Sequence, residues 1–390
     1  MSRLPLDNAA TSYPKPQCVW DAVDRWQRES GAAAGRGSHR AASAVQSVVT
    51  RCRRRAAELL GAPDPNHVVF TFNGTDSLNF AMHGLLVPGD HVVTTVLEHN
   101  SVLRPLRMLH DERGIEVTIV EPNARGLIEP SAIRDALQAN TRLVSVTHAS
   151  NVTGVIQPVA DIGQVARDGG ALLLVDAAQT AGHIPTRLTD LNADLLACPG
   201  HKGLLGPLGT GILVIADKLE PHLGSVRQGG TGTRSEEDSQ PDTLPDKYES
   251  GNHNTPGLVG LDAALGWIVE KGLHSLRQHE VETMTRLLDG LREIPGIALH
   301  GVDWSGDHPA TRSVGVVSFT FDALPPQDAA TILDEHAELE SRAGLHCAPG
   351  AHRFLGTFDT GGTVRLSPGP FTTTDQIEAA LAAIRDVAAG

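Results

Sequence analysis

The sequence predicts an α/β protein whose larger part is built on a mostly parallel β-sheet. From residue 67 onward, short apolar and β-branched runs alternate with amphipathic helical segments, a pattern typical of βαβ units. The expected strands are 67–71, 91–95, 115–120, 142–147 and 171–175. Beyond residue 292 strands and helices are mixed, and this part predicts a smaller α+β unit.

Composition limits the class of protein. The 390 residues are 40% hydrophobic and 20% charged, which is enough apolar material for a large core. The formal net charge of −14 argues against nucleic acid as the main partner. No apolar stretch approaches the length of a membrane span, and residues 1–16 lack the apolar centre of a signal peptide. We therefore expect a cytoplasmic protein that binds neither nucleic acid nor membranes.

The first part of the chain predicts an arm followed by two helices. Prolines in segment 4–16 exclude a helix there, so this segment is expected to be extended. Helical patterns cover about 18–29 and 40–60, and Gly61 ends the second. The basic cluster 51–55 lies within that second helix, where we expect it to form a solvated face.

The later chain predicts one long loop and a return to regular structure. Segment 224–256 is polar and glycine-rich, and loops of such length are usually functional or disordered. The elements expected after it are helical segments at 257–292, 326–339 and 375–387, and strands at 314–321 and 363–366.

A carboxylate and a lysine follow two apolar runs of the predicted sheet. Asp176 ends the run 171–175, and Lys202 lies in a Gly-His-Lys-Gly loop after the run 194–198. Ligands of open α/β sheets bind at the ends of strands. A lysine amine can form a Schiff base with pyridoxal phosphate (PLP), and a buried acid can keep the pyridine nitrogen protonated. Each residue alone has an ordinary interpretation, as a helix cap, a turn or a loop residue.

Further polar residues follow neighbouring strands. Gly74 and Thr75 begin a helix and could bind phosphate through free N–H groups, or Thr75 could simply cap the helix. His99 could stack on a planar cofactor or shuttle protons, or could be a helix cap or surface residue. Asn151 follows the strand 142–147, and it is expected to converge with Asp176 and Lys202 on one edge of the sheet.

Cys347 is the cysteine with the most reactive surroundings. It stands beside Gly and Pro residues with Arg342, His346 and His352 near in sequence, so we expect an exposed basic loop that favours the thiolate. The two histidines and the thiol could instead ligate a metal, although a fourth ligand is missing. A structural role is the remaining alternative, and the other three cysteines, at 18, 52 and 198, fit that role better.

With these residues assembled, the chain resembles the class V aminotransferase superfamily of fold-type I PLP enzymes. Within it, the chain is most similar to the cysteine desulfurase and selenocysteine lyase group. The motifs that carry the resemblance are Asp176-Ala-Ala-Gln179, Gly200-His-Lys202, Ser250-Gly-Asn-His-Asn-Thr-Pro256 and Arg342-Ala-Gly-Leu-His-Cys347. The resemblance implies a large domain over 17–260 with a mostly parallel, seven-stranded type of sheet, and a small domain of 1–16 plus 261–390.

The resemblance also implies how the cofactor is held. Lys202 would form the Schiff base with PLP and Asp176 would pair with the ring nitrogen. The other residues implied are His99 stacking on the ring, Gln179 and Asn151 at the ring hydroxyl, and Gly74, Thr75 and His201 at the phosphate. Two departures from the family pattern concern the phosphate. Pro199 replaces a serine, and the loop that completes the phosphate site of a second subunit reads Gly251-Asn252-His253-Asn254 where the family commonly has Gly-Thr-Pro-Asn.

The activity implied is cysteine desulfuration by a homodimer. Arg342, with Asn151, would hold the carboxylate of L-cysteine, because a guanidinium group can form a bidentate pair of hydrogen bonds with a carboxylate. Lys202 would move the proton on Cα, and the Cys347 thiolate would take the sulfur as a persulfide, leaving alanine. A sulfur-acceptor protein is a possible partner. The alternatives are a C–S lyase, selenocysteine lyase, epimerase or aminotransferase acting on a specialised amino acid.

Overall fold

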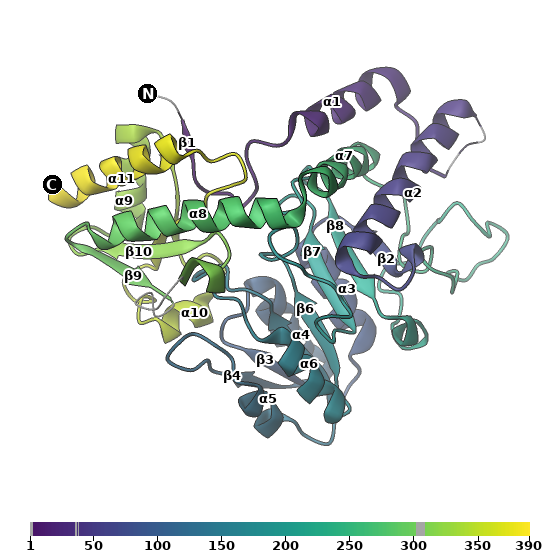
Figure 1. Cartoon of the computed structure of the whole chain (residues 1–390). Helices are drawn as coiled ribbons and strands as arrows, with labels where there is room; N and C mark the ends of the chain where they lie inside the picture. The colour runs from purple at the N-terminus through teal and green to yellow at the C-terminus, as the bar shows by residue number, and fades with distance from the viewer. Residues whose placement is uncertain (1–2, 36, 38, 302–308) are drawn as a thin grey trace.

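The fold is organised around a seven-stranded sheet, as the computed structural model shows for residues 3–35, 37, 39–301 and 309–390 (Figure 1). The strand order is β2-β8-β7-β6-β5-β3-β4, and the neighbouring strands from β7 to β4 run parallel. This confirms the predicted α/β class. The strands are β2 (Val68–Thr71), β3 (His91–Thr95), β4 (Glu116–Val120), β5 (Thr141–Thr147), β6 (Leu172–Asp176), β7 (Leu195–Pro199) and β8 (Gly211–Ile215).

Strand β8 was not predicted. It follows a loop so rich in glycine and proline that the sequence pattern there indicates only irregular structure. Its residues are nevertheless all buried, and it pairs antiparallel with both β7 and β2. Gly211 begins the strand where a Cβ atom would lie 2.4 Å from Thr71 Oγ1, so glycine permits this close approach.

Helices cover both faces of the large sheet. Successive residues of β6 point to opposite faces, since Leu173 and Val175 join one core cluster and Leu174 joins another. The first cluster includes side chains from α2, α6 and α7, and the second includes side chains from α3 and α4. The helices of this part are α1 (Gln17–Arg25), α2 (Arg40–Leu60), α3 (Gly74–Leu85), α4 (Asn100–Arg113), α5 (Pro130–Ala136), α6 (Val159–Asp168) and α7 (Thr255–Lys271).

The basic cluster of α2 is not the solvated face that its composition indicates. Arg53 is buried and binds both carboxylate oxygens of Glu249 at 2.7 Å. Arg51 and Arg55 both bind Asp262 of α7. The cluster was misread because both carboxylates lie some two hundred residues away in the sequence, beyond any local pattern.

The C-terminal part forms a second, four-stranded antiparallel sheet in the order β12-β13-β10-β9. Gly272, with φ of 79°, divides the helical segment expected at 257–292 into α7 and α8. The segment 224–254 is irregular apart from turns and bends, as expected. The elements of this part are α8 (Leu273–Arg292), β9 (Ile297–His300), β10 (Val317–Phe321), α9 (Pro326–Ala337), β12 (Arg342–Gly344), α10 (Pro349–Phe354), β13 (Thr363–Leu366) and α11 (Thr374–Ala389).

The N-terminal arm joins the two sheets. Its strand β1 (Leu4–Pro5) pairs with β11 (Leu339–Glu340), and Leu4 and Leu6 join the core of the C-terminal unit. Strand β1 and the last helix, α11, lie on that side of the molecule in Figure 1. We propose the division into a domain of 17–260 and a domain of 1–16 plus 261–390, which this packing of the arm supports. Within the described residues, no helix combines the length and apolar character needed to cross a membrane.

The Arg53–Glu249 pair predicts a large loss of stability on substitution. Arg53→Met leaves the Glu249 carboxylate buried without its partner, so urea denaturation should show a loss of about 3–5 kcal/mol at neutral pH. Burial alone would raise the pKa of Glu249, but Arg53 and His253 together outweigh it and lower that pKa to about 2. The stabilisation is therefore full above the ordinary pKa of 4.5 and disappears as the pH falls through 2.

The control is Arg54→Met, because Arg54 is the exposed neighbour on the same helix. It should change stability by no more than about 0.5 kcal/mol. Equal losses in the two variants would show that the buried ion pair is not the source of the effect.

Candidate active site

A cavity of about 210 Å³ lies at the carboxyl edge of the large sheet. It is bordered by residues that follow β2, β3, β5, β6 and β7, together with one residue of the C-terminal unit. This is the edge at which open α/β sheets bind ligands. Nine of the predicted site residues line it: Gly74, Thr75, His99, Asn151, Asp176, Gln179, His201, Lys202 and Arg342.

Lys202 and Asp176 provide the opposite charges of this cavity. Asp176 is the buried last residue of β6, and Lys202 follows β7, the strand next to it. Burial lowers the pKa of the Lys202 amine to about 8, although the Asp176 carboxylate acts in the opposite direction. Burial likewise raises the pKa of Asp176, against the effects of the Ala178 N–H, which donates to Oδ1 at 2.9 Å, and of Lys202. The amine is thus available in its neutral, nucleophilic form near pH 8.

His99 is held as a neutral ring of fixed tautomer. It caps the N-terminus of α4, where its Nδ1 accepts a hydrogen bond of 3.0 Å from the Ser101 N–H. The ring proton therefore lies on Nε2. Burial, followed by the charges of Lys202 and Arg342, lowers the pKa of His99 to about 4. The helix-cap interpretation of His99 is confirmed, and the same residue lines the cavity.

A row of hydroxyl groups continues from His99 to the start of α3. Ser101 Oγ lies 2.8 Å from His99 Nδ1 and 2.7 Å from Thr75 Oγ1. The cap of α3 is Asn73, whose side chain accepts from the Asp76 N–H, so Thr75 is free of that task. Ser101 was missed by the sequence reasoning. A hydroxyl residue two positions after His99, in the first turn of a helix, was the available signal.

The backbone next to Lys202 is fixed by the N-terminal arm. The carbonyl of His201 accepts from Lys15 Nζ at 2.8 Å, from Ser12 Oγ at 3.0 Å and from the Ser12 N–H at 3.1 Å. This convergence orients the peptide that leads into Lys202. The imidazole of His201 lines the cavity, and burial lowers its pKa to about 4.

Cys347 lies beside Arg342 but outside the residues that line the cavity. Its sulfur is 3.5 Å from the Arg342 guanidinium. The loop around it is anchored, since Asn151 donates to the His346 carbonyl at 2.6 Å and the Asn100 N–H donates to the Cys347 carbonyl at 2.7 Å. His346 and Cys347 have φ of 49° and 60°, which turns the chain sharply at the thiol.

The expected exposed basic loop at Cys347 is therefore wrong in two respects. The thiol is half-buried, and His346 and His352 are buried. Burial lowers the pKa of His346 to about 2 and that of His352 to about 4, so both rings are neutral. Arg342 supplies the positive charge instead. No three His, Cys, Asp or Glu side chains in the described part of the chain are grouped so that they could hold a metal.

The other cysteines follow the expected structural role only in part. Cys52 and Cys198 are buried, whereas Cys18 is exposed on α1. Cys18 was misjudged because a short amphipathic helix has a solvent face as well as an apolar one.

Asn252 does not line this cavity. It is exposed and borders a separate hollow with Arg227, Glu249 and His253. Pro199, in contrast, does line the cavity, where it lies against Gly74. Of the two departures from the family pattern, Pro199 therefore borders the cavity, and Asn252 lies outside it in the same chain.

Arg365 is a buried cation that sequence reasoning missed. It donates to Asp7 of the arm at 2.7 Å and to the carbonyl of Asn151 at 3.1 Å. One side chain of the small sheet thereby fixes both the arm and a residue of the cavity. Its position within a strand gave no signal of this role.

Comparisons with known proteins identify the family of the chain. The model of the family described as Aminotransferase class-V matches residues 5–380. The chain belongs to the class-V aminotransferase family. This confirms the family resemblance, and the family is PLP-dependent.

Full-length relatives carry a more specific name. A "Probable cysteine desulfurase" of Methanothermobacter thermautotrophicus is 35% identical, over 95% of this chain and 91% of the relative. The apo structure of a cysteine desulfurase from Thermococcus onnurineus NA1 is 33% identical with a TM-score of 0.90, covering 99% and 94% of the two chains. A second structure, of a C-DES mutant with glycine covalently linked to its PLP cofactor, has a TM-score of 0.83. At 22% identity, covering 99% and 97% of the two chains, it shows the fold alone.

The Asp176 carboxylate predicts a shift in the titration of Lys202. Asp176→Asn removes the negative charge that opposes the effect of burial, so the pKa of the Lys202 amine should fall from about 8 by about one unit. The pH dependence of acylation at Lys202, followed by peptide mass spectrometry in cofactor-free protein, measures this. Asp190→Asn, at an exposed position, serves as the control. An unchanged midpoint for Lys202 in Asp176→Asn would contradict the assigned electrostatic pairing.

Proposed function

We propose that the protein is a PLP-dependent cysteine desulfurase that moves the sulfur of L-cysteine onto Cys347 and releases L-alanine. The observation that carries the proposal is the position of the Cys347 thiol. It lies 3.5 Å from Arg342, which lines the same cavity as Lys202 and Asp176. The names of the full-length relatives support the same activity.

The residues present in the cavity fit PLP. Lys202 is a buried amine of lowered pKa, which suits it to carry the aldehyde, and Asp176 is a buried carboxylate suited to a protonated ring nitrogen. His201 Nδ1 is buried with no hydrogen-bond partner among the described residues, and it can donate to a phosphate. The N-terminal N–H groups of α3 favour the same anion. When bound, PLP supplies a ring that accepts electrons from the substrate's Cα.

The chain's own residues supply the remaining assignments. We assign Gly74, Thr75 and His201 to the phosphate, His99 to the face of the ring, and Asn151 and Gln179 to its hydroxyl edge. The Asn151 amide N–H already donates to the His346 carbonyl, so its side-chain oxygen is the atom left for this purpose. The hydroxyl groups of Thr75 and Ser101 border the same space as Pro199 and offset the missing serine hydroxyl.

Arg342 lies where it can bind the substrate while it contacts the sulfur of Cys347. We assign its guanidinium to the carboxylate of L-cysteine, a bidentate contact that orients the amino acid. Lys202 Nζ then takes the proton from Cα as a general base, for which a pKa near 8 is suitable. Because the Cys347 sulfur lies beside the same guanidinium, the substrate sulfur is brought toward the thiol that receives it.

The transfer itself takes place between two sulfur atoms. The Cys347 thiolate attacks the sulfur of the substrate, and a new S–S bond forms as the Cβ–S bond breaks. The electron pair of the broken bond remains on Cβ, where a proton completes the methyl group. Lys202 then returns a proton to Cα, and L-alanine is complete. A sulfur-acceptor protein would then collect the persulfide sulfur from the half-buried Cys347.

We further propose that the protein is a homodimer. Asn252 lies in an exposed loop away from Lys202, where it is accessible to the site of a second copy. A cytoplasmic setting is proposed as well, and the four free cysteines support it, because cytoplasmic thiols stay reduced.

Cys347→Ser tests the covalent role of the thiol. A serine hydroxyl is a far weaker nucleophile toward sulfur, so formation of alanine from L-cysteine should fall at least about 100-fold. Cys18→Ser, which removes an exposed thiol of α1, should leave the rate unchanged. Alanine formed at the full rate by Cys347→Ser would refute the role of Cys347. Pyruvate and ammonia in place of alanine would favour a C–S lyase.

A further inference from the structure

A second, smaller cavity borders Lys202 as well. Its volume is about 30 Å³, and its walls include Lys202, Ser12, His183 and Glu280. A cavity that holds a buried water molecule needs a volume of roughly 10–15 Å³ and two to four polar groups that can hydrogen-bond to the water. A hydroxyl, an imidazole and a carboxylate provide those partners. The smaller cavity is therefore suited to hold water next to Lys202.

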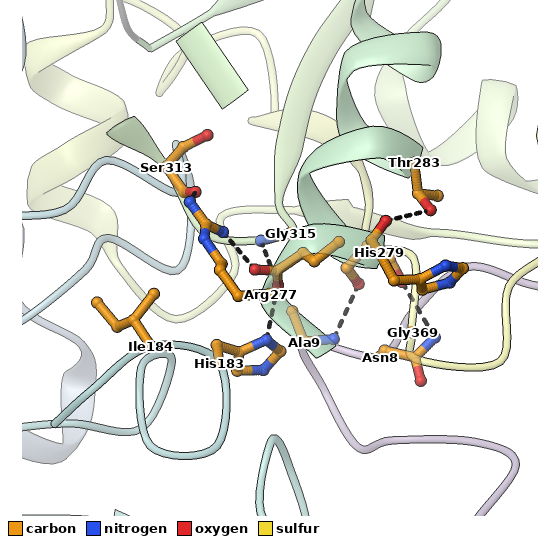
Figure 2. A network of polar contacts seen from close by, with 12 residues as sticks. Asn8, Ala9, His183, Ile184, Arg277, His279, Thr283, Ser313, Gly315 and Gly369 are labelled. Atoms are coloured by element: carbon orange, nitrogen blue, oxygen red, sulfur yellow. Dashed lines mark hydrogen bonds and ion pairs between the residues drawn. The ribbon is translucent and has the colours of Figure 1, made fainter. Parts of the chain in front are cut away.

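His183 and Glu280 form a close pair in the wall of the smaller cavity. His183 Nδ1 lies 2.6 Å from Glu280 Oε1. Figure 2 shows His183 on the loop after β6, facing the labelled residues Arg277 and Gly315. A carboxylate at Nδ1 fixes the tautomer of a histidine and raises the basicity of its other nitrogen. Nε2 is consequently the atom of His183 that can exchange protons.

The Nε2 edge of His183 lies against the backbone next to Lys202. A Cβ atom built on Gly203 would be 2.4 Å from His183 Cδ2 and 2.6 Å from Nε2, so only glycine allows the ring to approach this closely. The His183 side chain keeps 23% of its surface exposed. One ring thus connects the surroundings of Lys202 with solvent.

Helix α8 fixes the Glu280 carboxylate that orients this ring. Arg277 and the Gly315 N–H both donate to it, the latter at 2.9 Å, and the contacts converge in Figure 2. Arg277 is itself held by the Ser313 carbonyl at 2.7 Å. Burial favours the protonated carboxyl, but His183 and Arg277 outweigh it, so the pKa of Glu280 is lowered and the group stays ionised. The charged groups around His183 are Glu280 and Arg277 from α8, Lys202, and Lys15, which binds Ser12.

We propose that His183, oriented by Glu280, relays protons between Lys202 and solvent through water in the smaller cavity. The inference rests on the proposed function, in which Lys202 takes up the proton of the substrate's Cα. That proton passes from Nζ to a cavity water as the water gives one of its own to His183 Nε2, which releases a proton to solvent. The reverse sequence returns a proton to Lys202, so no other reactant is required.

His183 therefore acts through Lys202 and contacts neither substrate nor cofactor in this proposal. It is a relay residue, and its loss should slow proton exchange with solvent more than it weakens binding. Loss of a residue with a purely structural role would weaken binding and slow proton exchange together.

The test follows the Cα position of alanine, the reaction product. Holoenzyme is incubated in ordinary water with L-alanine deuterated at Cα, and loss of deuterium is measured by proton NMR. His183→Gln keeps a hydrogen-bonding group in the wall but takes up no proton, so exchange should slow about 10- to 100-fold with KM for alanine unchanged. Imidazole added to His183→Ala should restore exchange. His336→Gln, an exposed residue of α9, should behave as wild type.

Exchange at the wild-type rate in His183→Gln, or no rescue by imidazole, would overturn the relay. Lys202→Ala should abolish exchange altogether, which separates the two proposals. If wild-type protein shows no exchange, the proposed function fails, and the relay is judged by structure alone.

The structural measurement does not depend on activity. A crystal structure of the protein, with or without PLP, should contain ordered water in the smaller cavity within hydrogen-bonding distance of both Lys202 Nζ and His183 Nε2. A cavity without such water, or a His183 ring turned away from it, would contradict the relay.

Discussion

The burial of an amine beside a carboxylate is the constraint on which the rest of the structure depends. Burial makes either charge costly alone, lowering the pKa of Lys202 and raising that of Asp176, so each is stabilised by the other. The two side chains line one cavity because β6, which ends in Asp176, and β7, which Lys202 follows, are parallel neighbours. The order of the large sheet thus gives the cavity its chemistry, and the smaller cavity beside Lys202 offers its protons a route to solvent.

The small sheet and the arm complete the site from the other side. Arg342 brings the thiol of Cys347 to the edge of the cavity, and Arg365 ties Asp7 of the arm to Asn151. The arm also fixes the carbonyl before Lys202. The Lys202 amine, the Arg342 guanidinium and the Cys347 thiol are therefore held in one framework, although they belong to segments far apart in the sequence.

The sequence was sufficient for the parts of the molecule that local patterns determine. Apolar runs indicated most strands of the large sheet, and strand ends indicated Asp176 and Lys202. Contacts between distant segments left no such pattern: Arg53 was taken for a solvated residue, and Arg365 gave no signal. The Cys347 loop was placed at the surface because neutral, buried histidines look the same in sequence as charged, exposed ones.

The central claim is that Cys347 carries sulfur taken from L-cysteine. Peptide mass spectrometry of the holoenzyme after one turnover with L-cysteine, with alanine measured in the same sample, tests it most directly. The account predicts the mass of one added sulfur atom on the peptide that contains Cys347, with alanine in equal amount. Alanine formed without sulfur on that peptide, or sulfur carried only by another cysteine, would contradict it.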